Sequence, residues 1–418
     1  VADLHRALLA SPAGGPRRPG WRRRRQLALV TPWPPQRSGV AGYSARLVEA
    51  LRRRIDVEVD VFVDGDDPGA GLPAGSLRRV GQARGGYDAV VVSLGNSEFH
   101  AGALGLLRGG LRALVVAHDV RLTGLYRHAV SRGAVPEGFV AALRAMYPDF
   151  ADHVGAAVED GWLPPEAAER AGVLMAREAI GLSWRFLATS EHAAGLARLD
   201  AAPGQAAKVG VLPYAYPPVT TRAAADEDAG LVTSFGLVDP AKCPEVAVQA
   251  LAILAPGRPQ ARLVFVGPAA DSERRRLGAL AAGAGVGDRV SFTGHVSDAD
   301  YEGWLRRSTV AVQLRRSTNG EASAAVGDCL AQGIATVVTE IGPQRELPAA
   351  VSKVPAGVTP AGLAEAVAGL LDDTGRRRAV GMAAQAWAGA RGFDAAAQAL
   401  MAVVEAGSAA GPGRCGRW

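Results

Sequence analysis

The chain has 418 residues, of which 48% are hydrophobic and 21% charged, and its formal net charge is +5. This length predicts about two domains, and the apolar content with a low net charge excludes a chain that is disordered as a whole. No apolar stretch approaches the roughly 20 residues of a membrane-spanning helix. The three cysteines (Cys243, Cys329, Cys415) are too few and scattered for a disulfide framework or a zinc site, which favours a reducing, cytoplasmic compartment.

The positive charge is concentrated at one end of the chain. Residues 1–25 hold seven arginines and one acid, Asp3, so this segment carries +6 and the remaining chain −1. The body of the protein is therefore not a basic nucleic-acid-binding surface, and we expect no nucleic-acid partner. We interpret residues 1–25 as a disordered arm. The alternative is that the arm contacts an anionic membrane and places the protein at the inner membrane face.

Strand-like and helix-like segments alternate through the first half of the chain. Valines alternate with acidic residues from 57 to 63, which is the period-2 pattern of a strand. Residues 113–117 are entirely apolar, as is typical of a strand buried in a parallel sheet. We expect strands at 27–31, 57–63, 89–94, 113–117, 186–189 and 209–212, a helix at 40–53 and a long helical region at 122–180.

Residues 213–230 contain three prolines and an Ala/Asp/Glu stretch, and they predict an interdomain linker. The alternation then repeats. We expect strands at 231–235, 262–266, 290–292, 310–313 and 336–338, and helices at 244–254, 271–282, 298–306, 322–332, 361–371, 375–390 and 393–406. The predicted division is an arm (1–25), an N-terminal domain (26–215), a C-terminal domain (216–385), and a helix and tail (386–418) that packs back on the N-terminal domain.

Alternating strands and helices predict an α/β fold with two Rossmann-like, doubly wound domains that face each other across a cleft. In such sheets, ligands bind beyond the carboxyl ends of the strands. The loops that lead from strands into helices are therefore the candidate sites.

The richest of these loops follows the strand at 310–313. Small residues around Ser323 lead into a helix, and the free N–H groups of its first turn would suit a diphosphate. Glu321 is expected in this turn. Asp328 is expected two turns on, where a carboxylate can accept hydrogen bonds from two ribose hydroxyls. The alternative is that Glu321 caps the helix and Asp328 is a solvated surface residue.

Three further loops carry candidate residues. Lys242, one of only three lysines among 46 basic residues, stands in a helix's first turn, where it can meet a phosphate or simply be a surface cation. Gly39 and Gly42, after the first strand, allow a ligand to approach the backbone closely. His118 and Asp119 stand at the carboxyl end of the buried strand at 113–117, where a histidine is either functional or structural.

These loops and several short motifs follow one another along the chain in an order that is typical of a known family. The chain carries a Gly-rich first loop, His118-Asp119, Ala188-Thr189-Ser190-Glu191, Ser234-Phe235-Gly236 with Lys242, Phe265-Val266-Gly267, Phe292-Thr293-Gly294-His295, and the Glu321/Asp328 loop before Leu330-Ala331-Gln332-Gly333. In number, order and spacing they resemble the family-4 (group 1) retaining glycosyltransferases of the GT-B fold, over about residues 27–406. The resemblance implies transfer of a sugar from a nucleotide diphosphate donor with retention at the anomeric carbon, and no cofactor besides this donor substrate.

The resemblance also implies roles for individual residues. The C-terminal domain would bind the nucleotide sugar and the N-terminal domain the acceptor. The implied catalytic residues are His118 near the donor sugar, Lys242 on the diphosphate and Glu321 on the sugar hydroxyls. Asp328 would take the ribose, and Gly294 to Val296 would frame the base. The implied donor-binding residues are Gly39, Gly236, Lys242, Gly294, His295, Val296, Glu321, Ala322, Ser323, Ala324 and Asp328.

Fewer residues can be assigned to the acceptor-binding side of the cleft. Glu98 and His100 follow the strand at 89–94 and would face the cleft, so with Asp119 they are the acceptor-binding candidates. Small molecules, glycolipids and saccharides all remain open as acceptors. An Asp-x-Asp string at 64–66 matches a metal-binding pattern of another glycosyltransferase fold, but it is more simply a turn. Asp298 and Asp300 most simply cap a helix, and we expect no metal.

The chain departs from the family pattern at three positions. Gly320 stands where the strict pattern has its first Glu, and the second Glu is Asp328, seven residues after Glu321 instead of eight. Leu237 replaces a frequent arginine, whose charge Arg315 or Arg316 would have to supply.

No nucleophilic carboxylate presents itself for a double displacement. We therefore expect front-face, metal-independent transfer, in which a donor phosphate oxygen accepts the proton of the acceptor hydroxyl. The alternatives are a nucleotide-sugar 2-epimerase on the same scaffold and a catalytically decayed sugar-nucleotide-binding protein.

Overall fold

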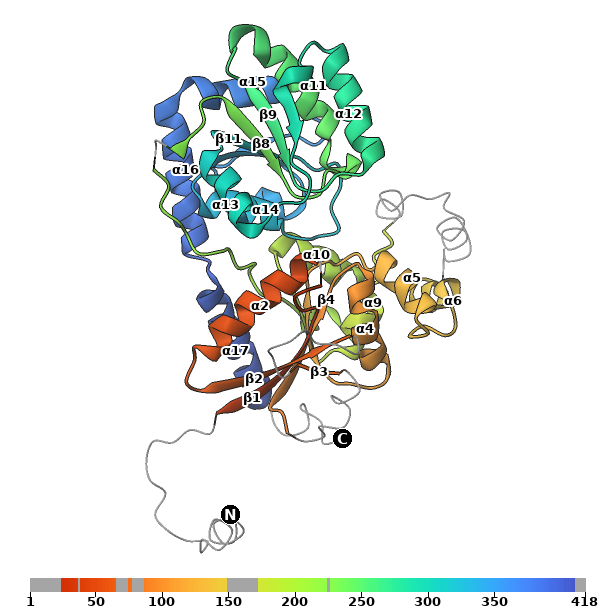
Figure 1. The fold of residues 1–418 in the computed structure, drawn as a ribbon. Helices are drawn as coiled ribbons and strands as arrows, with labels where there is room; N and C mark the ends of the chain where they lie inside the picture. The colour runs from red at the N-terminus through yellow and green to blue at the C-terminus, as the bar shows by residue number, and fades with distance from the viewer. Residues whose placement is uncertain are drawn as a thin grey trace, which may run out of the picture.

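The computed structural model describes residues 24–36, 38–64, 74–76, 86–148, 172–223 and 226–409. The arm predicted for residues 1–25 lies almost entirely outside these residues, and Arg25 is the first residue of strand β1. Two α/β lobes are stacked one above the other, each built around a twisted parallel sheet (Figure 1). This is the predicted fold class of two Rossmann-like domains.

The N-terminal lobe contains a seven-stranded parallel sheet in the order β3-β2-β1-β4-β5-β6-β7. Its strands are β1 (Arg25–Val30), β2 (Val57–Val63), β3 (Ala74–Ser76), β4 (Ala89–Leu94), β5 (Leu114–Ala117), β6 (Arg185–Ala188) and β7 (Val209–Val211). Its helical elements are α2 (Gly39–Arg52), η1 (Glu98–His100), α4 (Ala101–Arg108), α5 (Thr123–Ser131), α6 (Phe139–Met146), α9 (Arg177–Leu182) and α10 (Glu191–Asp200).

Both faces of this sheet are covered by helices, which explains its apolar strands. Successive residues of β1 alternate between two cores: Ala28 and Val30 pack with α4, α5, α6, α9 and α10, whereas Leu27 and Leu29 pack with α2 and α17 (Phe393–Ala409). The predicted helical region at 122–180 contains α5, α6 and α9, and its residues 149–171 lie outside the described part of the chain.

The C-terminal lobe contains a six-stranded parallel sheet in the order β10-β9-β8-β11-β12-β13. Its strands are β8 (Leu231–Phe235), β9 (Arg262–Val266), β10 (Val290–Phe292), β11 (Val310–Gln313), β12 (Ala335–Thr339) and β13 (Ser352–Val354). Its helical elements are η4 (Pro240–Lys242), α11 (Pro244–Leu254), α12 (Asp271–Gly283), α13 (Asp298–Arg307), α14 (Ala324–Ala331), η7 (Gly342–Glu346), α15 (Pro360–Asp372) and α16 (Thr374–Gly389).

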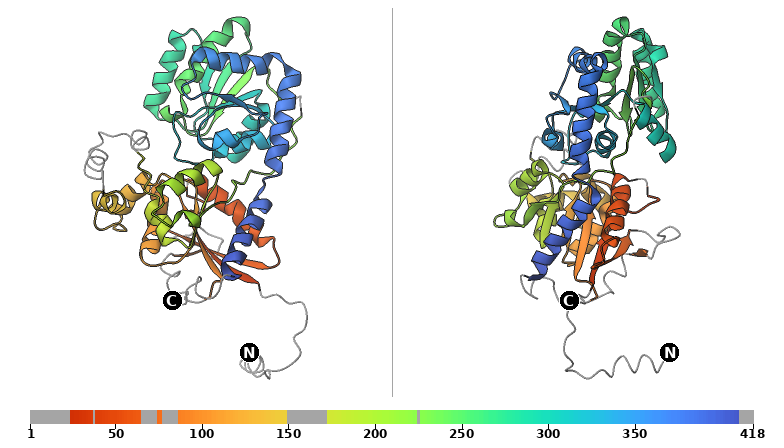
Figure 2. Two further views of the ribbon diagram at one scale, coloured as in Figure 1. Left: turned by 180° about the vertical axis from the view of Figure 1, so that it is seen from behind. Right: turned by 90° about the vertical axis from the view of Figure 1, so that its left-hand side faces the viewer.

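Two segments cross between the lobes. The chain first crosses upward after β7. It returns through α16 and then α17, which runs along the lower lobe against α2 (Figures 1 and 2). The two crossing segments pair where they meet, because the Tyr216 N–H donates to the Arg391 carbonyl (2.9 Å) and Tyr216 forms a parallel bridge with Gly392. The aliphatic face of α17 is buried in the N-terminal core.

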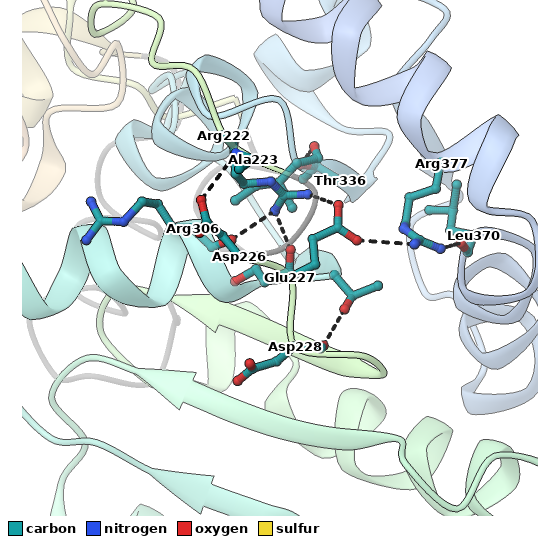
Figure 3. A network of polar contacts seen from close by, with 12 residues as sticks. Arg222, Ala223, Asp226, Glu227, Asp228, Arg306, Thr336, Leu370 and Arg377 are labelled. Atoms are coloured by element: carbon teal, nitrogen blue, oxygen red, sulfur yellow. Dashed lines mark hydrogen bonds and ion pairs between the residues drawn. The ribbon is translucent and has the colours of Figure 1, made fainter.

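The second half of the predicted linker is fixed to the C-terminal lobe by buried charges. Figure 3 shows Glu227 between two arginines: it accepts hydrogen bonds from Arg222 and from Arg377, the latter at 3.1 Å. The three side chains are only 9–11% exposed. Arg377 also donates to the Leu370 carbonyl at 3.0 Å. Because a buried charge is stable only when it is paired, Arg222 and Glu227 form part of the C-terminal lobe.

Among the described residues, no helix is both long enough and apolar enough to cross a bilayer.

Candidate active site between the two lobes

Lys242 lies beyond the carboxyl end of β8, in the turn η4. Its Nζ is 3.3 Å from the Phe235 carbonyl oxygen. It packs over Gly236, where an added Cβ would be 2.8 Å from Nζ. Burial, and then the charge of Arg315, lower the pKa of Lys242 to about 8. Lys242 is thus a half-buried cation next to a second cation, unlike a lysine on an exposed helix.

Of the two arginines that follow β11, only Arg315 points toward Lys242. Arg315 forms an ion pair with Glu321, and its charge acts on Lys242. Arg316 instead pairs with Glu245 of α11 at 2.7 Å, on the outer side of the loop. Leu237, at the position of the family's frequent arginine, is half exposed. Arg315 is therefore the residue positioned to replace the missing charge.

Glu321 is held in the loop before α14, and its expected place in the first helical turn is wrong. The helix begins one residue after Ser323, whose hydroxyl accepts the Val326 N–H at 3.4 Å. One oxygen of Glu321 accepts the Asn319 N–H (2.6 Å) and the Thr318 hydroxyl (3.1 Å), and the other accepts from Arg315. Glu321 is therefore fixed by its own loop and does not cap the helix.

Asp328 lies on α14 and accepts a hydrogen bond from the Tyr301 hydroxyl at 3.0 Å. Burial raises the pKa of Asp328, while this hydrogen bond and the charge of Arg46 oppose the rise. Asp328 is therefore not a solvated surface residue. Arg46 belongs to α2, so a cation of the N-terminal lobe acts on this carboxylate. Neither Tyr301 nor Arg46 was a candidate, because the sequence places them 27 and 282 positions from Asp328 with no shared motif.

The loops after β8, β9 and β10 contact each other through backbone atoms at glycine residues. A Cβ on Gly267 would lie 2.3 Å from the Gly236 carbonyl oxygen, and Gly267 forms an antiparallel bridge with Gly294. His295 is exposed, and Val296 is partly buried beside α13. Gly267 therefore allows a contact between the loops that a side chain at this position would prevent.

His118 and His100 are both buried in the N-terminal lobe. The ring of His118 meets Tyr43 of α2 edge-on, with centroids 5.0 Å apart, and burial lowers the pKa of His118 to about 3. The Nδ1 of His100 is 3.0 Å from the Ser93 carbonyl, and burial lowers the pKa of His100 to about 4. His100 is buried beneath Gly95 and does not line the cleft surface. The prediction that His100 contacts the acceptor is therefore wrong.

Asp119 faces the C-terminal lobe. Its Oδ2 accepts the backbone N–H of Asn96 at 2.7 Å. Burial, and then the charge of Glu321, raise the pKa of Asp119 to about 7. Arg315 and Arg121 act in the opposite direction. The charges of two carboxylates, one from each lobe, therefore act on each other across the interface.

The remaining candidates of the N-terminal lobe are exposed. Glu98 is 44% exposed, and one of its oxygens lies 3.8 Å from Nε2 of His128. Gly39 is the exposed first residue of α2, and the helix is capped by Ser38, whose hydroxyl accepts the Val40 N–H at 3.2 Å.

The two lobes contact each other directly through the Glu321 loop. The Asn319 carbonyl accepts the backbone N–H groups of Val120 (2.8 Å) and Arg121 (3.1 Å). Arg121 also donates from its side chain to the Thr318 carbonyl at 3.2 Å. Gly320 has φ +88°, and a Cβ there would lie 2.5 Å from Cγ2 of Val120. This contact explains the departure at position 320, because a glutamate cannot be accommodated there.

A second contact joins the lobes. The carboxylate of Glu346, in η7, accepts the backbone N–H groups of Glu191 (3.1 Å) and His192 (2.6 Å) at the start of α10. An anion from the C-terminal lobe thus meets the positive end of an N-terminal-lobe helix.

Asp64 and Asp300, from the two acidic stretches of the sequence, form hydrogen bonds with neighbouring protein groups. Asp64 accepts the Gly102 N–H (2.9 Å) and pairs with Arg132 (3.2 Å), while residues 65–66 lie outside the described part of the chain. Ser297 caps α13 and hydrogen-bonds to Asp300. Within the described ranges, no group of three or more His, Cys, Asp or Glu side chains could hold a metal ion.

Comparisons with known proteins agree with this architecture. Residues 221–387 match the model of the glycosyl transferases group 1. A D-inositol 3-phosphate glycosyltransferase of Streptomyces avermitilis is 27% identical, over 95% of this chain and 90% of that protein.

Two solved structures share the fold along nearly the whole chain. Anabaena HepE in complex with UDP has a TM-score of 0.63 at 17% identity, covering 91% of this chain and 100% of that one. The sucrose-phosphate synthase of Thermosynechococcus elongatus has a TM-score of 0.65 at 18% identity, covering 93% and 100%. The C-terminal lobe therefore matches the glycosyl transferases group 1, and the chain as a whole shares the two-lobed GT-B fold of these solved structures.

Proposed function

We propose that this protein is a group 1 glycosyltransferase that transfers a sugar from a nucleoside diphosphate to an acceptor hydroxyl with retention at the anomeric carbon. The observation that carries the proposal is the linked set of Lys242, Arg315 and Glu321 at the carboxyl edge of the C-terminal sheet. Two cations suit a diphosphate, and a fixed carboxylate suits sugar hydroxyls. UDP is the first nucleotide to test, because HepE, which shares the fold, is described in complex with UDP and with UDP-glucose.

The reaction needs stabilisation of the leaving group. As the bond between the anomeric carbon and the phosphate oxygen breaks, negative charge grows on the diphosphate. Lys242, Arg315 and the first N–H groups of α14 would stabilise that charge. We propose that these groups act without a metal ion.

The available carboxylates favour front-face attack. Glu321 is engaged by Arg315, Asn319 and Thr318, and burial and Glu321 raise the pKa of Asp119 to about 7, so that part of the Asp119 population is protonated and not nucleophilic near neutral pH. The acceptor oxygen would instead bond to the anomeric carbon on the side that the diphosphate leaves. Its proton would pass to the departing phosphate oxygen.

Neither alternative has comparable support. An epimerase needs an acid and a base beside the sugar, and the two histidines do not supply them, because burial keeps His118 and His100 neutral, with pKa values of about 3 and 4. A catalytically decayed site would be expected to have lost the charged residues that interact there. In this chain Arg315 still forms an ion pair with Glu321, and its charge acts on Lys242.

A panel of UDP-, GDP- and dTDP-sugars, incubated with pooled hydroxyl acceptors, tests this function. We expect acceptor-dependent release of the nucleotide from one donor, a product with the anomeric configuration of that donor, and an unchanged rate in EDTA. Epimer formation without acceptor would support the epimerase, and binding without turnover a decayed site. Loss of activity in EDTA with recovery in Mn²⁺ would contradict the metal-independent mechanism.

The affinity for UDP is expected to fall as the pH rises above about 8. The pKa of Lys242 is lowered from 10.5 to about 8, so this amine is charged below pH 8 and neutral above it. The terminal phosphate of UDP is fully charged above about pH 7. The loss of affinity above this pH therefore measures the deprotonation of the Lys242 amine. Calorimetry should show a decline approaching roughly tenfold per pH unit above this pKa. Lys242→Arg, which stays charged, should bind UDP more weakly but without this decline, and the same decline in that variant would contradict the assignment.

A further inference from the structure

Carboxylates follow three strands of the N-terminal sheet. Asp64 comes directly after β2, Glu98 four residues after β4, and Asp119 two residues after β5. These strands lie in the order β2-β1-β4-β5, and all of them are parallel. The carboxyl ends of parallel strands meet at one edge, so the three carboxylates lie along one rim. Asp119 fixes the position of that rim, because it faces Glu321 of the C-terminal lobe.

Asp119 has capacity to receive a further donor. Its Oδ2 accepts the Asn96 N–H, whereas its Oδ1 accepts no hydrogen bond from the residues that the structure describes. The side chain stands beside His118 in the chain and opposite Glu321. An acceptor hydroxyl brought close to the transferred sugar would lie near this oxygen.

Three arginines near this rim are engaged by protein groups, whereas Arg127 of α5 is exposed. Arg121 is fully buried and donates to the Thr318 carbonyl. Arg315 pairs with Glu321, and Arg132 pairs with Asp64 at 3.2 Å. One oxygen of Glu98 lies 3.8 Å from Nε2 of His128, the charge of Glu98 also acts on His100, and its side chain is 44% exposed. Among the described residues, neither Glu98 nor Asp119 forms an ion pair with an arginine or a lysine.

We propose that the acceptor is a polyol that is uncharged, or carries an amine, where it faces Asp119 and Glu98, and that it is not a phosphate ester at that position. This rests on the proposed function, in which the N-terminal lobe holds the acceptor. Carboxylates accept hydrogen bonds from hydroxyl and ammonium groups but repel a phosphate. Such an acceptor would distinguish this chain from its 27% identical relative, a D-inositol 3-phosphate glycosyltransferase.

The test compares three probes that differ in one substituent: myo-inositol, its D-3-phosphate, and an amino-deoxy-inositol. UDP affinity is measured first in the same samples, and each probe is then titrated into the UDP-saturated protein by calorimetry and saturation-transfer NMR. We expect myo-inositol and the amine to bind at least roughly tenfold more tightly than the phosphate. A failure to bind UDP would count against the proposed function. UDP binding with the opposite order of probes, or with no probe bound, would overturn only this inference.

Variants that change the charge at Asp119 or Glu98 test whether these carboxylates cause the preference for an uncharged or amino-substituted probe over a phosphate. Asp119→Asn and the exposed Glu98→Lys should each raise the affinity for the phosphate relative to myo-inositol by about threefold to tenfold. Asp56→Asn is the matched control, since Asp56 precedes β2 at the opposite end of the sheet and pairs with Arg54. It should leave the ratio unchanged. Because Glu98 is exposed, Glu98→Lys remains informative if Asp119→Asn fails to fold, and an unchanged ratio in Glu98→Lys would overturn the proposal.

Discussion

Replacing Lys242 by methionine is expected to lower kcat/KM for sugar transfer by about 10²–10³-fold. The substitution keeps the length of the side chain and removes the cation that would meet the charge developing on the diphosphate. Lys242 is half-buried, so water replaces this interaction poorly. Steady-state kinetics with the donor identified in the panel would measure the loss, and a rate within a factor of two of wild type would reject the role of Lys242.

Two comparisons separate this role from a general effect of losing a lysine. Lys208→Met makes the same chemical change in the N-terminal lobe, where Lys208 donates to the Gly181 carbonyl at 2.7 Å, and it should leave kcat/KM unchanged. Lys242→Arg should restore only part of the activity. The amine packs against Gly236 and the Phe235 carbonyl, which leaves little room for a guanidinium group.

Gly320→Ala is expected to lower transfer by roughly tenfold to a hundredfold, through the contact between the lobes. The backbone at φ +88° is strained for an alanine, at about 1–2 kcal/mol. The added methyl would also lie 2.5 Å from Val120. Relieving that overlap would move the Thr318–Glu321 loop away from the N-terminal lobe, together with the carboxylate that faces the donor sugar. Transfer rates and small-angle scattering of the UDP complex would measure the loss and the opening.

Matched variants divide this effect into its two parts. Gly357→Ala imposes a similar backbone strain (φ +74°) at a site with no atom within 4 Å of the new Cβ, so activity should be retained. Adding Val120→Ala to Gly320→Ala removes the overlapping methyl groups and should recover part of the loss. If the double variant is no more active than Gly320→Ala, the contact between the lobes is not the cause.

The architecture could be predicted because it depends on local patterns. The alternation at 57–63 and the apolar run at 113–117 became buried parallel strands, as expected. Strands β3 (Ala-Gly-Ser) and β13 (Ser-Lys-Val) were not predicted, since they contain few apolar residues, whereas the equally short β7 (Val-Gly-Val) and β10 (Val-Ser-Phe) were predicted from theirs. The helix expected at 322–332 begins at Ala324, because the Ser323 hydroxyl caps it there.

The site could be predicted only as a set of loops. Strand ends indicated Lys242, Asp119 and the Glu321 region, but not which side chains meet. Arg121 contacts Thr318 across 197 positions, and Arg46 acts on Asp328 from the other lobe. Contacts of this kind arise when two separately folded lobes dock, and no spacing within either lobe encodes them.

The buried Glu227 network has a consequence for exchanging domains between glycosyltransferases of this architecture. A graft that begins at β8 would leave Arg377 in the transplanted lobe without its carboxylate, and a buried unpaired guanidinium strongly destabilises a fold. The transplant therefore has to include the stretch from Arg222 onward, while α17 has to stay with the recipient, whose core it completes. Suitable junctions lie where Tyr216 and Gly392 pair, because both crossings can be cut there without dividing either core.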